Sequence, residues 1–438
     1  MSKFSNGVRS LTGGRGVTQF SMVIALIAII IIFEVLEPGY TLDPTNVINV
    51  VQQYSYIFIL AIGMVMVIIA GHIDLSVGSV SAFVGISVAQ SIAVWHFPPG
   101  VAMLFGLVIG VLVGAWQGFW VAYVRVPAFI VTLAGQLIFR GGNQIIGGGT
   151  DVPTPDSYNW IGAGFIPDFG GGAYSNGTLL LGLLVILALI GNEIRGRRRR
   201  ILMHATASPL WSSVVRIIVL CGITGYVTFE FASGDPGTSF PVVGIIAGVL
   251  ILIYSFVMNN TIFGRQVYAV GGNAAAAVLS GVNSRRVNFF VMMNMSVLAA
   301  VAGMVYVGHA GASGLSDGTG WELDAIAAVF VGGAAVSGGI GTVAGSIIGA
   351  FVMAFLTNGL SGLGIDSDYT SIIRGLVLLL AVAFDVYNKT QGRPSITGQL
   401  LRGLHRPAKG DGGPVTEAGL DAQPQGITGS EDTTRVNS

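Results

Sequence analysis

An acid and an imidazole stand close together between two long apolar runs, in the stretch Gly-His-Ile-Asp-Leu-Ser-Val-Gly-Ser at 71–79. A carboxylate at the centre of a membrane helix costs roughly 2.5 to 3.5 kcal/mol, so Asp74 must face a protein interior or a water-filled cavity. Gly71 and Gly78 lower the cost of a backbone that leaves the helix. We therefore predict a broken or re-entrant helix, whose special residues are His72, Asp74, Ser76 and Gly78. The alternative, a short turn at the cytoplasmic surface with Asp74 solvated or capping the next helix, stays open.

The last third of the chain has a second stretch of this kind. Glu322 and Asp324 open an apolar run that ends in glycine clusters between 332 and 341. These clusters exceed what helix packing needs, and they predict a second interrupted helix. Gly345 and Gly349 form a G-x-x-x-G pair, for which close helix packing is the simpler interpretation. Two interrupted segments, one in each half, are typical of transporters built from internal repeats, although no sequence repeat is visible.

The elements that position these residues are expected to be membrane helices. The chain has 438 residues, of which 52% are hydrophobic and 10% charged, against roughly 25% charged in soluble domains. Twelve apolar runs approach the roughly 20 residues that span a bilayer. We expect an all-α, polytopic membrane helical bundle of about 10–12 transmembrane helices with one or two broken or re-entrant segments. The single cysteine, Cys221, lies in an apolar run and predicts an inert buried thiol.

The basic residues define the expected topology. If the N-terminus is cytoplasmic and the runs alternate in direction, the inner segments hold all of the 21 Lys and Arg except Arg140, Arg216 and Arg374, which fall in proposed spans. The outer loops then carry none, as the positive-inside rule requires. We expect both termini in the cytoplasm. The expected parts are a cytoplasmic N-terminal segment (1–17), a transmembrane domain (18–388) and a disordered cytoplasmic tail (389–438).

Two connecting segments have distinctive compositions. The outer loop at 147–176 is rich in Gly, Pro and Asp, and it is either a docking surface or a plain connector. In the inner loop at 259–287, Asn273 is a good N-cap, four alanines follow it, and Gly281 is a helix stop, which together predict one short helix. A helix that short is marginal in water. Docking on a partner or on the same protein explains it, and packing beneath the bundle is the alternative.

Four motifs make the sequence recognisable. They are the stretch at 71–79, Pro-Ala-Phe-Ile-Val-Thr-Leu-Ala-Gly at 127–135, Phe-Gly-Arg-Gln-Val-Tyr-Ala-Val-Gly-Gly-Asn at 263–273 and Glu-Leu-Asp-Ala-Ile-Ala-Ala at 322–328. Over about residues 45–387 the chain resembles the permease subunits of bacterial ABC sugar importers of the ribose, xylose and galactose group. The stretch at 114–123 and an insertion with two extra spans at about 177–232 resemble the D-xylose branch in particular.

The resemblance implies a subunit that carries a monosaccharide, D-xylose or a related pentose, across the bacterial cytoplasmic (inner) membrane. It implies as partners a cytoplasmic ABC ATPase, an extracytoplasmic sugar-binding protein and a second copy of the chain, with membrane lipid around the dimer. The short helix of the inner loop would couple to the ATPase, through Arg265, Gly271, Gly272, Asn273, Leu279, Ser280 and Gly281. Candidate residues of the sugar path or its broken helices are His72, Asp74, Ser76, Gly78, Asn143, Gln144, Glu322 and Asp324.

A neutral sugar needs no counter-charge, so the path is expected to be lined by amides, hydroxyls and aromatic rings. Trp116 and Gln117 are further candidates, although Trp near a span end is commonly an interfacial anchor. For Asp324, near the start of a span, helix capping competes with sugar binding. The chain departs from the family where His72 replaces the usual Gly or Glu, and where Ala274–Ala277 replace charged residues at the expected partner contact.

The alternative function is a proton-coupled secondary sugar transporter. It needs an intramembrane proton relay, for which His72 and Asp74 are the one close imidazole and acid pair. A membrane-embedded enzyme finds little support, because the five histidines are scattered and no H-E-x-x-H pair occurs. We expect no catalytic residue, metal, cofactor or nucleic-acid partner. ATP hydrolysis is expected in a separate subunit, since the chain has no G-x-x-x-x-G-K-[ST] phosphate loop.

Overall fold

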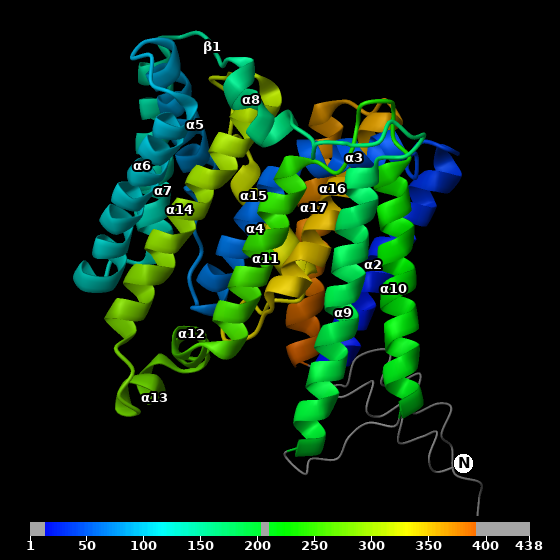
Figure 1. Cartoon of the computed structure of the whole chain (residues 1–438). Coiled ribbons are helices and arrows are strands. Elements are labelled where there is room, and N and C mark those ends of the chain that lie inside the picture. Colours follow the sequence, from blue (N-terminus) through cyan, green and yellow to red (C-terminus); the bar gives the residue numbers. More distant parts are fainter. Residues whose placement is uncertain (1–13, 203–209, 391–438) are drawn as a thin grey trace, which may run out of the picture. The chain divides into compact units, whose positions relative to one another are not determined.

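The computed structural model describes residues 14–202 and 210–390, which fold as a bundle of helices (Figure 1). The first half contains α2 (Gly14–Leu36), α3 (Pro44–Gln53), α4 (Ser55–Ile69), α5 (Val77–Ala93), α6 (Pro99–Phe119), the π-helical turn η1 (Trp120–Val124), α7 (Ala128–Gly147), β1 (Val152–Pro153), α8 (Asp156–Ala163) and α9 (Asn176–Leu202). The second half contains α10 (Leu210–Ala232), α11 (Val242–Asn260), α12 (Ile262–Gly272), α13 (Ala274–Leu279), α14 (Ser284–Ala310), β2 (Ala312–Ser313), α15 (Trp321–Val331), α16 (Val343–Gly362) and α17 (Ser367–Thr390). The expected fold class, a polytopic helical bundle, is confirmed.

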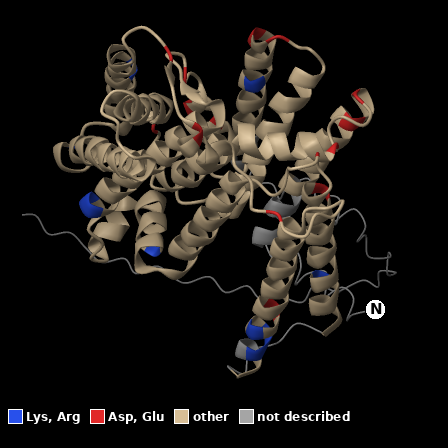
Figure 2. Cartoon of the chain, turned by 45° about the horizontal axis from the view of Figure 1, so that its top comes forward, with Lys and Arg blue, Asp and Glu red and all other residues tan. Residues whose placement is uncertain are grey.

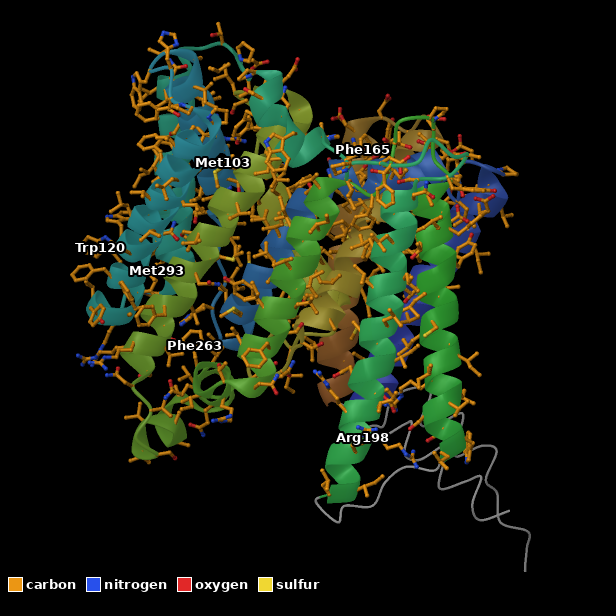
Figure 3. All side chains as sticks on the ribbon, in the orientation of Figure 1. Met103, Trp120, Phe165, Arg198, Phe263 and Met293 are labelled. Atoms are coloured by element: carbon orange, nitrogen blue, oxygen red, sulfur yellow. The ribbon has the colours of Figure 1, made fainter. Side chains whose placement is uncertain are left out.

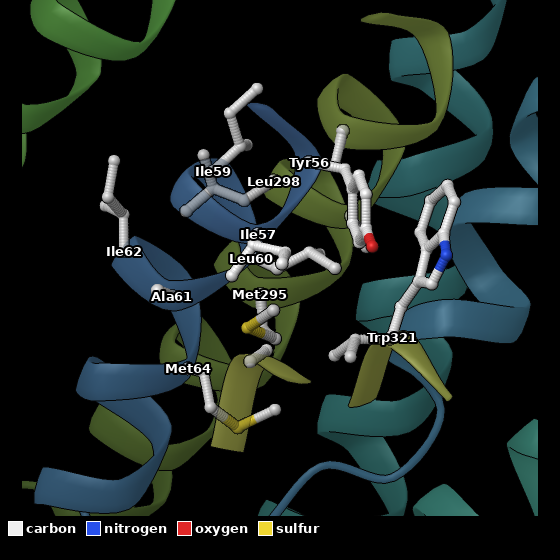
Figure 4. Packing of buried hydrophobic residues seen from close by; sticks show 14 of the residues in the cluster. Tyr56, Ile57, Ile59, Leu60, Ala61, Ile62, Met64, Met295, Leu298 and Trp321 are labelled. Atoms are coloured by element: carbon white, nitrogen blue, oxygen red, sulfur yellow. The ribbon is translucent and has the colours of Figure 1, made fainter. Parts of the chain in front are cut away.

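Helix α4 lies at the centre of the bundle, and all 15 of its residues are buried. Its sequence is apolar on every face, which is the composition of a helix that other helices surround. Helices α14, α15 and α16 pack against it. A Cβ added at Gly63 of α4 would lie 2.6 Å from the sulfur of Met295 on α14, so the two helices touch there (Figure 4). The two helices that flank the second interruption, α15 and α16, therefore pack on α4, which itself leads into the first interruption.

Helices α9 and α10 lie at the periphery. Only 17% of the apolar stretch of α9 and 6% of that of α10 are buried, against 78% for α16. These two helices pack mainly on each other and fall on the expected insertion at 177–232. Their remaining apolar surface has the composition of a lipid-facing helix.

Six helices of the described chain are long and apolar enough to cross a membrane, or seven spans if the bent pair α3 and α4 is counted as one. One of the twelve apolar runs that predict spans extends over 47–70, which implies one continuous helix there. The structure corrects this, because the chain bends by 49° between α3 and α4. Helices α5 and α15 are short, since each adjoins a non-helical segment. The number of ten to twelve spans remains a prediction.

Charge is segregated between the two ends of the helices. In Figure 2 most acidic positions lie toward one end, and several basic positions lie toward the other. Arg198 on α9 and Phe263 on α12 lie toward the same end, whereas Phe165 lies toward the opposite one (Figure 3). This is the alternation that the sequence predicted for the segments around 195–200, 259–287 and 147–176. Which end faces the cytoplasm remains a prediction.

The segment at 147–176 is more structured than a plain connector. It contains α8, whose Tyr158 is fully buried and donates its hydroxyl hydrogen to the Met304 carbonyl oxygen of α14 at 2.9 Å. Strand β1 pairs antiparallel with β2, with Val152 opposite Ser313. The segment is thereby tied to the chain that follows α14. Trp160 remains 53% exposed on it.

Some predictions fall outside the described residues. The tail at 389–438 lies outside them except for its first two residues, and so does most of the N-terminal segment at 1–17. The five arginines between 195 and 200 all lie in α9, and the side chains of Arg195, Arg197 and Arg198 are among those described.

The G-x-x-x-G pair packs as the sequence indicated. A Cβ added at Gly345 would lie 2.4 Å from the Gly332 carbonyl oxygen, and one at Gly349 would lie 2.0 Å from the Ala328 carbonyl oxygen. The backbones of α15 and α16 therefore touch at these two glycines, as small residues permit.

We expect Gly349→Ala to destabilise the bundle by about 1–3 kcal/mol, because the added methyl must push α15 away from α16. The midpoint of thermal unfolding in detergent measures this. Gly222→Ala is the matched control, since a Cβ there meets no atom within 4 Å. In the interior of α10 it should be neutral or stabilise by about 0.5–1 kcal/mol. Equal shifts for the two variants would contradict the close contact.

Candidate functional site

The backbone leaves the helix between α4 and α5, over residues 70–76. Gly71 has a φ of +86°, which glycine adopts without strain. Asp74 is 0% exposed, and its Oδ1 accepts hydrogen bonds from the Ser76 N–H at 2.8 Å and the Ser76 hydroxyl at 2.7 Å. Gln117 of α6 donates from Nε2 to that hydroxyl oxygen at 2.7 Å. The interrupted helix is confirmed, and the alternative of a solvated Asp74 is wrong.

The second interruption is confirmed between α15 and α16. Residues 332–342 are non-helical. Four glycines there have positive φ angles, and three of these lie in the left-handed region, namely Gly333 (+79°), Gly338 (+78°) and Gly339 (+73°). An L side chain is strained in that region, which accounts for the glycines that helix packing left unexplained.

Three polar side chains of α7 form a line that we call the α7 ladder: Gln136, Arg140 and Asn143. Residues three and four apart share one face of a helix. Arg140 donates to the Asp317 carbonyl oxygen at 2.6 Å and to the Thr319 hydroxyl. Asn143 donates to the Leu315 carbonyl oxygen at 3.1 Å. The ladder therefore holds the segment between β2 and α15 against α7.

Glu322, the second residue of α15, contacts Gln136 of the α7 ladder. Its Oε1 accepts a hydrogen bond from Gln136 Nε2 at 2.9 Å. A Cβ added at Gly78 would lie 2.6 Å from Glu322 Oε2 and 2.1 Å from the Gly318 carbonyl oxygen. The carboxylate thus lies at the first turn of α5, where the helix dipole favours a negative charge. No residue larger than glycine fits at position 78 in this arrangement.

Asp324 has a partner that the sequence did not indicate. Both of its carboxylate oxygens accept from Arg374 Nη1 of α17 at 2.9 Å, and the Tyr56 hydroxyl also bonds this carboxylate. Asp324 does lie in the first turn of α15. Its carboxylate nonetheless pairs with a cation, so helix capping is not its main role, and Arg374 is the functional candidate that sequence analysis missed.

An aromatic cluster borders these carboxylates. The rings of Tyr56 and Trp321 are stacked with centroids 4.1 Å apart (Figure 4). Tyr306 meets Trp321 edge-on at 4.6 Å. Trp321 is 7% exposed, so its ring is almost fully covered by neighbouring residues. Sequence analysis named Trp116 instead, whose indole packs edge-on against Phe139 and is 37% exposed.

Both interruptions meet a third backbone segment at what we call the glycine junction (Gly71, Gly271, Gly338 and Gly339). The Gly339 N–H donates to the Ile69 carbonyl oxygen at 2.8 Å. A Cβ added at Gly271 would lie 1.6 Å from that same oxygen and 2.9 Å from the Gly339 nitrogen. One added at Gly338 would lie 3.1 Å from the Gly71 Cα. Backbone contacts this close leave no room for a Cβ at Gly271, and little at Gly338 or Gly339.

Gly271 belongs to the α12–α13 arm (262–279). Sequence analysis expected one helix here. The second half is α13, whose N-cap Asn273 accepts from the Ala276 N–H at 2.9 Å. Helix α12 was missed because its three glycines lower helix propensity. The Thr261 cap offsets this loss, and so does the hydrogen bond that the Tyr268 hydroxyl donates to the Gly341 carbonyl oxygen at 2.8 Å. Leu279 is 89% exposed at the tip of α13.

Other candidates lie apart from these contacts. Gln144 is exposed, on a different face of α7 from the buried Asn143. His72 lies beside Asn288 of α14, and in the described part of the chain no hydrogen bond joins it to Asp74. Among residues 14–202 and 210–390, no group of three or more His, Cys, Asp or Glu could hold a metal ion.

Comparison with known proteins places the chain among permeases. The family described as branched-chain amino acid transport system / permease component matches residues 46–382. The chain is 39% identical to the xylose transport system permease protein XylH of Escherichia coli (strain K12), over 88% of this chain and 94% of that protein. It is 39% identical to XylH of Haemophilus influenzae, over 84% of this chain and 96% of that protein. It is 33% identical to the ribose import permease protein RbsC of Escherichia coli (strain K12), over 84% and 93%. No solved structure matches the chain.

We expect Arg374→Gln to destabilise the protein by about 3 kcal/mol, because it leaves the Asp324 carboxylate buried without its cation. Adding Asp324→Asn should recover most of that loss. Arg216→Gln is the control, since its ion pair with Glu193 is 46% and 25% exposed and exposed pairs contribute about 0–1 kcal/mol. Thermal unfolding in detergent checks the series, and a double variant no more stable than Arg374→Gln would refute the pairing argument.

Proposed function

Because this chain belongs to the family of branched-chain amino acid transport system permease components, we propose that it is the membrane-spanning permease of an ABC importer that translocates a monosaccharide. Four sequence motifs first indicated a resemblance to sugar importers. The identity of the chain to xylose and ribose permeases confirms that resemblance. D-xylose or a related pentose is the proposed substrate. The sugar identity rests on the higher identity to the xylose permeases.

The observation that carries the proposal is the position of the α12–α13 arm. At one end the arm presents the exposed Leu279. Near its middle, at the end of α12, Gly271 touches the end of α4 and the segment that follows α15. A push on α13 by a soluble partner therefore reaches both interrupted helices through one backbone contact. This is the connection that an importer powered by a separate ATPase needs.

The proposed sugar path begins at the first turns of α5 and α15. Asp74, Glu322 and Gln117 carry buried oxygen atoms without a hydrogen-bond partner among the described residues. Acceptors of this kind can bind sugar hydroxyls once the segments separate, and Trp321 can stack on a sugar ring. In the conformation described these groups are covered, so movement of the two interrupted segments would open the path.

The remaining parts of the assembly follow from the same proposal. An extracytoplasmic binding protein delivers the sugar, a cytoplasmic ABC ATPase contacts the α12–α13 arm, and a second copy of the chain completes the path. The protein lies in the bacterial inner membrane among lipids, with both termini in the cytoplasm. Arg265, Gly271, Gly272, Asn273, Leu279, Ser280 and Gly281 are proposed to couple to the ATPase.

The test is ATP hydrolysis in vesicles that contain this chain, its ATPase and its binding protein. We expect hydrolysis to rise when binding protein loaded with D-xylose is added, and Leu279→Glu to lose that rise, because a charge replaces an apolar contact at the arm's tip. Leu279 is too exposed for this change to affect folding. Sugar uptake driven by a proton gradient in the absence of the ATPase would overturn the proposal.

A glycine of the junction and a glycine outside the coupling residues form a matched pair of variants. Gly271→Ala should uncouple hydrolysis from uptake, because its methyl would overlap the Ile69 carbonyl oxygen. Gly248→Ala in α11 should behave as wild type, since a Cβ there meets no atom within 4 Å. Uptake per ATP hydrolysed is the measurement. If both variants behave alike, the arm does not act through this contact.

Asp74→Asn separates the proposal from the proton-coupled alternative. The amide keeps an oxygen that can accept from Ser76, and its NH2 group can donate to a sugar hydroxyl oxygen. An ATP-driven permease should therefore retain most of its uptake. A proton-driven transporter should lose coupling, because Asn cannot bind and release a proton. Radiolabelled sugar uptake, with either ATP or a pH gradient as the energy source, distinguishes the two.

A further inference from the structure

A cavity of about 540 Å³ opens between the segment after α4 and the ends of three other elements. Its lining comes from His72 and Ile73 of that segment, from the chain that joins η1 to α7 at 125–129, and from the start of α14 at Ser284, Arg285 and Asn288. It therefore lies where the first interrupted segment meets two helix starts. Its two arginines, Arg125 and Arg285, belong neither to the proposed sugar path nor to the α12–α13 arm.

The charge in this cavity has one sign. Arg125 and Arg285 line it, and no Asp or Glu is among its lining residues. In the described chain neither arginine has a carboxylate within salt-bridge distance; the ion pairs found there are Arg216 with Glu193 and Arg374 with Asp324. Two guanidinium groups facing one cavity repel each other unless an anion lies between them.

Helix starts add to that field. Helix α7 begins at Ala128 and has no side-chain hydrogen bond at its N-cap, Pro127. The Ile130 N–H donates to the Pro127 carbonyl oxygen at 3.0 Å. The N–H groups of Ala128 and Phe129, which line the cavity, are available to a ligand. Helix α14, of 27 residues, begins at Ser284 on another wall. Both helix dipoles present positive ends here, which favours a negative group.

Two polar side chains of the cavity wall, His72 and Asn288, lie side by side. His72 belongs to the first interrupted segment and Asn288 to α14. A ligand bound in the cavity would therefore lie beside the contact between these two elements.

We propose that this cavity binds a phosphate ester, held by Arg125, Arg285 and the first turn of α7. Guanidinium groups bind phosphate through paired, charge-assisted hydrogen bonds. The wall also carries exposed apolar side chains, with Phe129 55% and Ile73 38% exposed. This suits the headgroup of an anionic phospholipid, and a soluble phosphate ester shares the same chemistry. A bound ester would bridge α7, α14 and the 71–76 segment, and so would bias the movement of the first interruption.

Native mass spectrometry of the purified chain tests this with two probes, dioleoyl phosphatidic acid and glycerol phosphate, and with dioleoyl phosphatidylcholine as the uncharged comparison. The test variant is Arg125→Gln/Arg285→Gln. The control is Arg265→Gln/Arg286→Gln, which removes the same charge from neighbouring arginines outside the cavity lining. We expect the test variant to lose affinity for the phosphate probe by about tenfold or more. The control should bind as wild type.

The two probes distinguish the source of the phosphate. Selective loss of phosphatidic acid binding supports a lipid ligand, and selective loss of glycerol phosphate binding supports a soluble one. Equal losses in the two double variants, or no binding of either probe, would overturn the proposal. Ser284→Asp is a second variant that the fold should accept, because an acid suits the first position of a helix. It should also weaken binding, and unchanged binding would count against the site. The measurement does not depend on transport.

Discussion

The structure depends on a requirement that membrane-embedded backbone imposes: each N–H and C=O group that leaves a helix needs another partner. Helix α4 ends inside the bundle, and its Ile69 carbonyl oxygen accepts from the Gly339 N–H of the other interrupted segment. The two interruptions therefore satisfy one another. Gly271 lies against the same oxygen, so the α12–α13 arm is held at the contact between them. Moving any one of the three segments changes the hydrogen bonding of the others.

The buried carboxylates also need partners inside the bundle. Asp74 bonds Ser76 at the entry to α5, Glu322 bonds Gln136 beside the first turn of α5, and Asp324 bonds Arg374. Each acid is matched by a helix start, an amide or a cation, which offsets the desolvation that burial imposes. Because two of the three lie at the N-terminus of the short helix α5, a shift of that helix would expose them together. Irregular backbone, helix dipoles and acceptor oxygens therefore coincide, as in other transporters with discontinuous helices.

The comparison between sequence and structure is most informative at residues whose partners lie far along the chain. Asp74, Ser76 and Gly78 were found because glycine and an acid inside an apolar run contradict a simple helix. Gln136, Arg140 and Arg374 were missed, although a polar residue at every third or fourth position of an apolar span was a usable signal for the first two. Helix α12 was missed because its residues have low helix propensity. A tertiary contact, the Tyr268 hydrogen bond to the Gly341 carbonyl oxygen, overrides that propensity. The bend between α3 and α4 had no clear local signal.

The sequence by itself determined the membrane class, the helical architecture, both interruptions and the family. These follow from apolar length, from charge placement and from glycine's freedom at positive φ, all of which act over a few residues. Only the tertiary structure decided that Gly71, Gly271 and Gly338 meet, that the α7 ladder holds the segment before α15, and that Arg374 neutralises Asp324. Those contacts join residues 50 to more than 250 positions apart. Helix packing sets such distances, and no local pattern in one sequence records them.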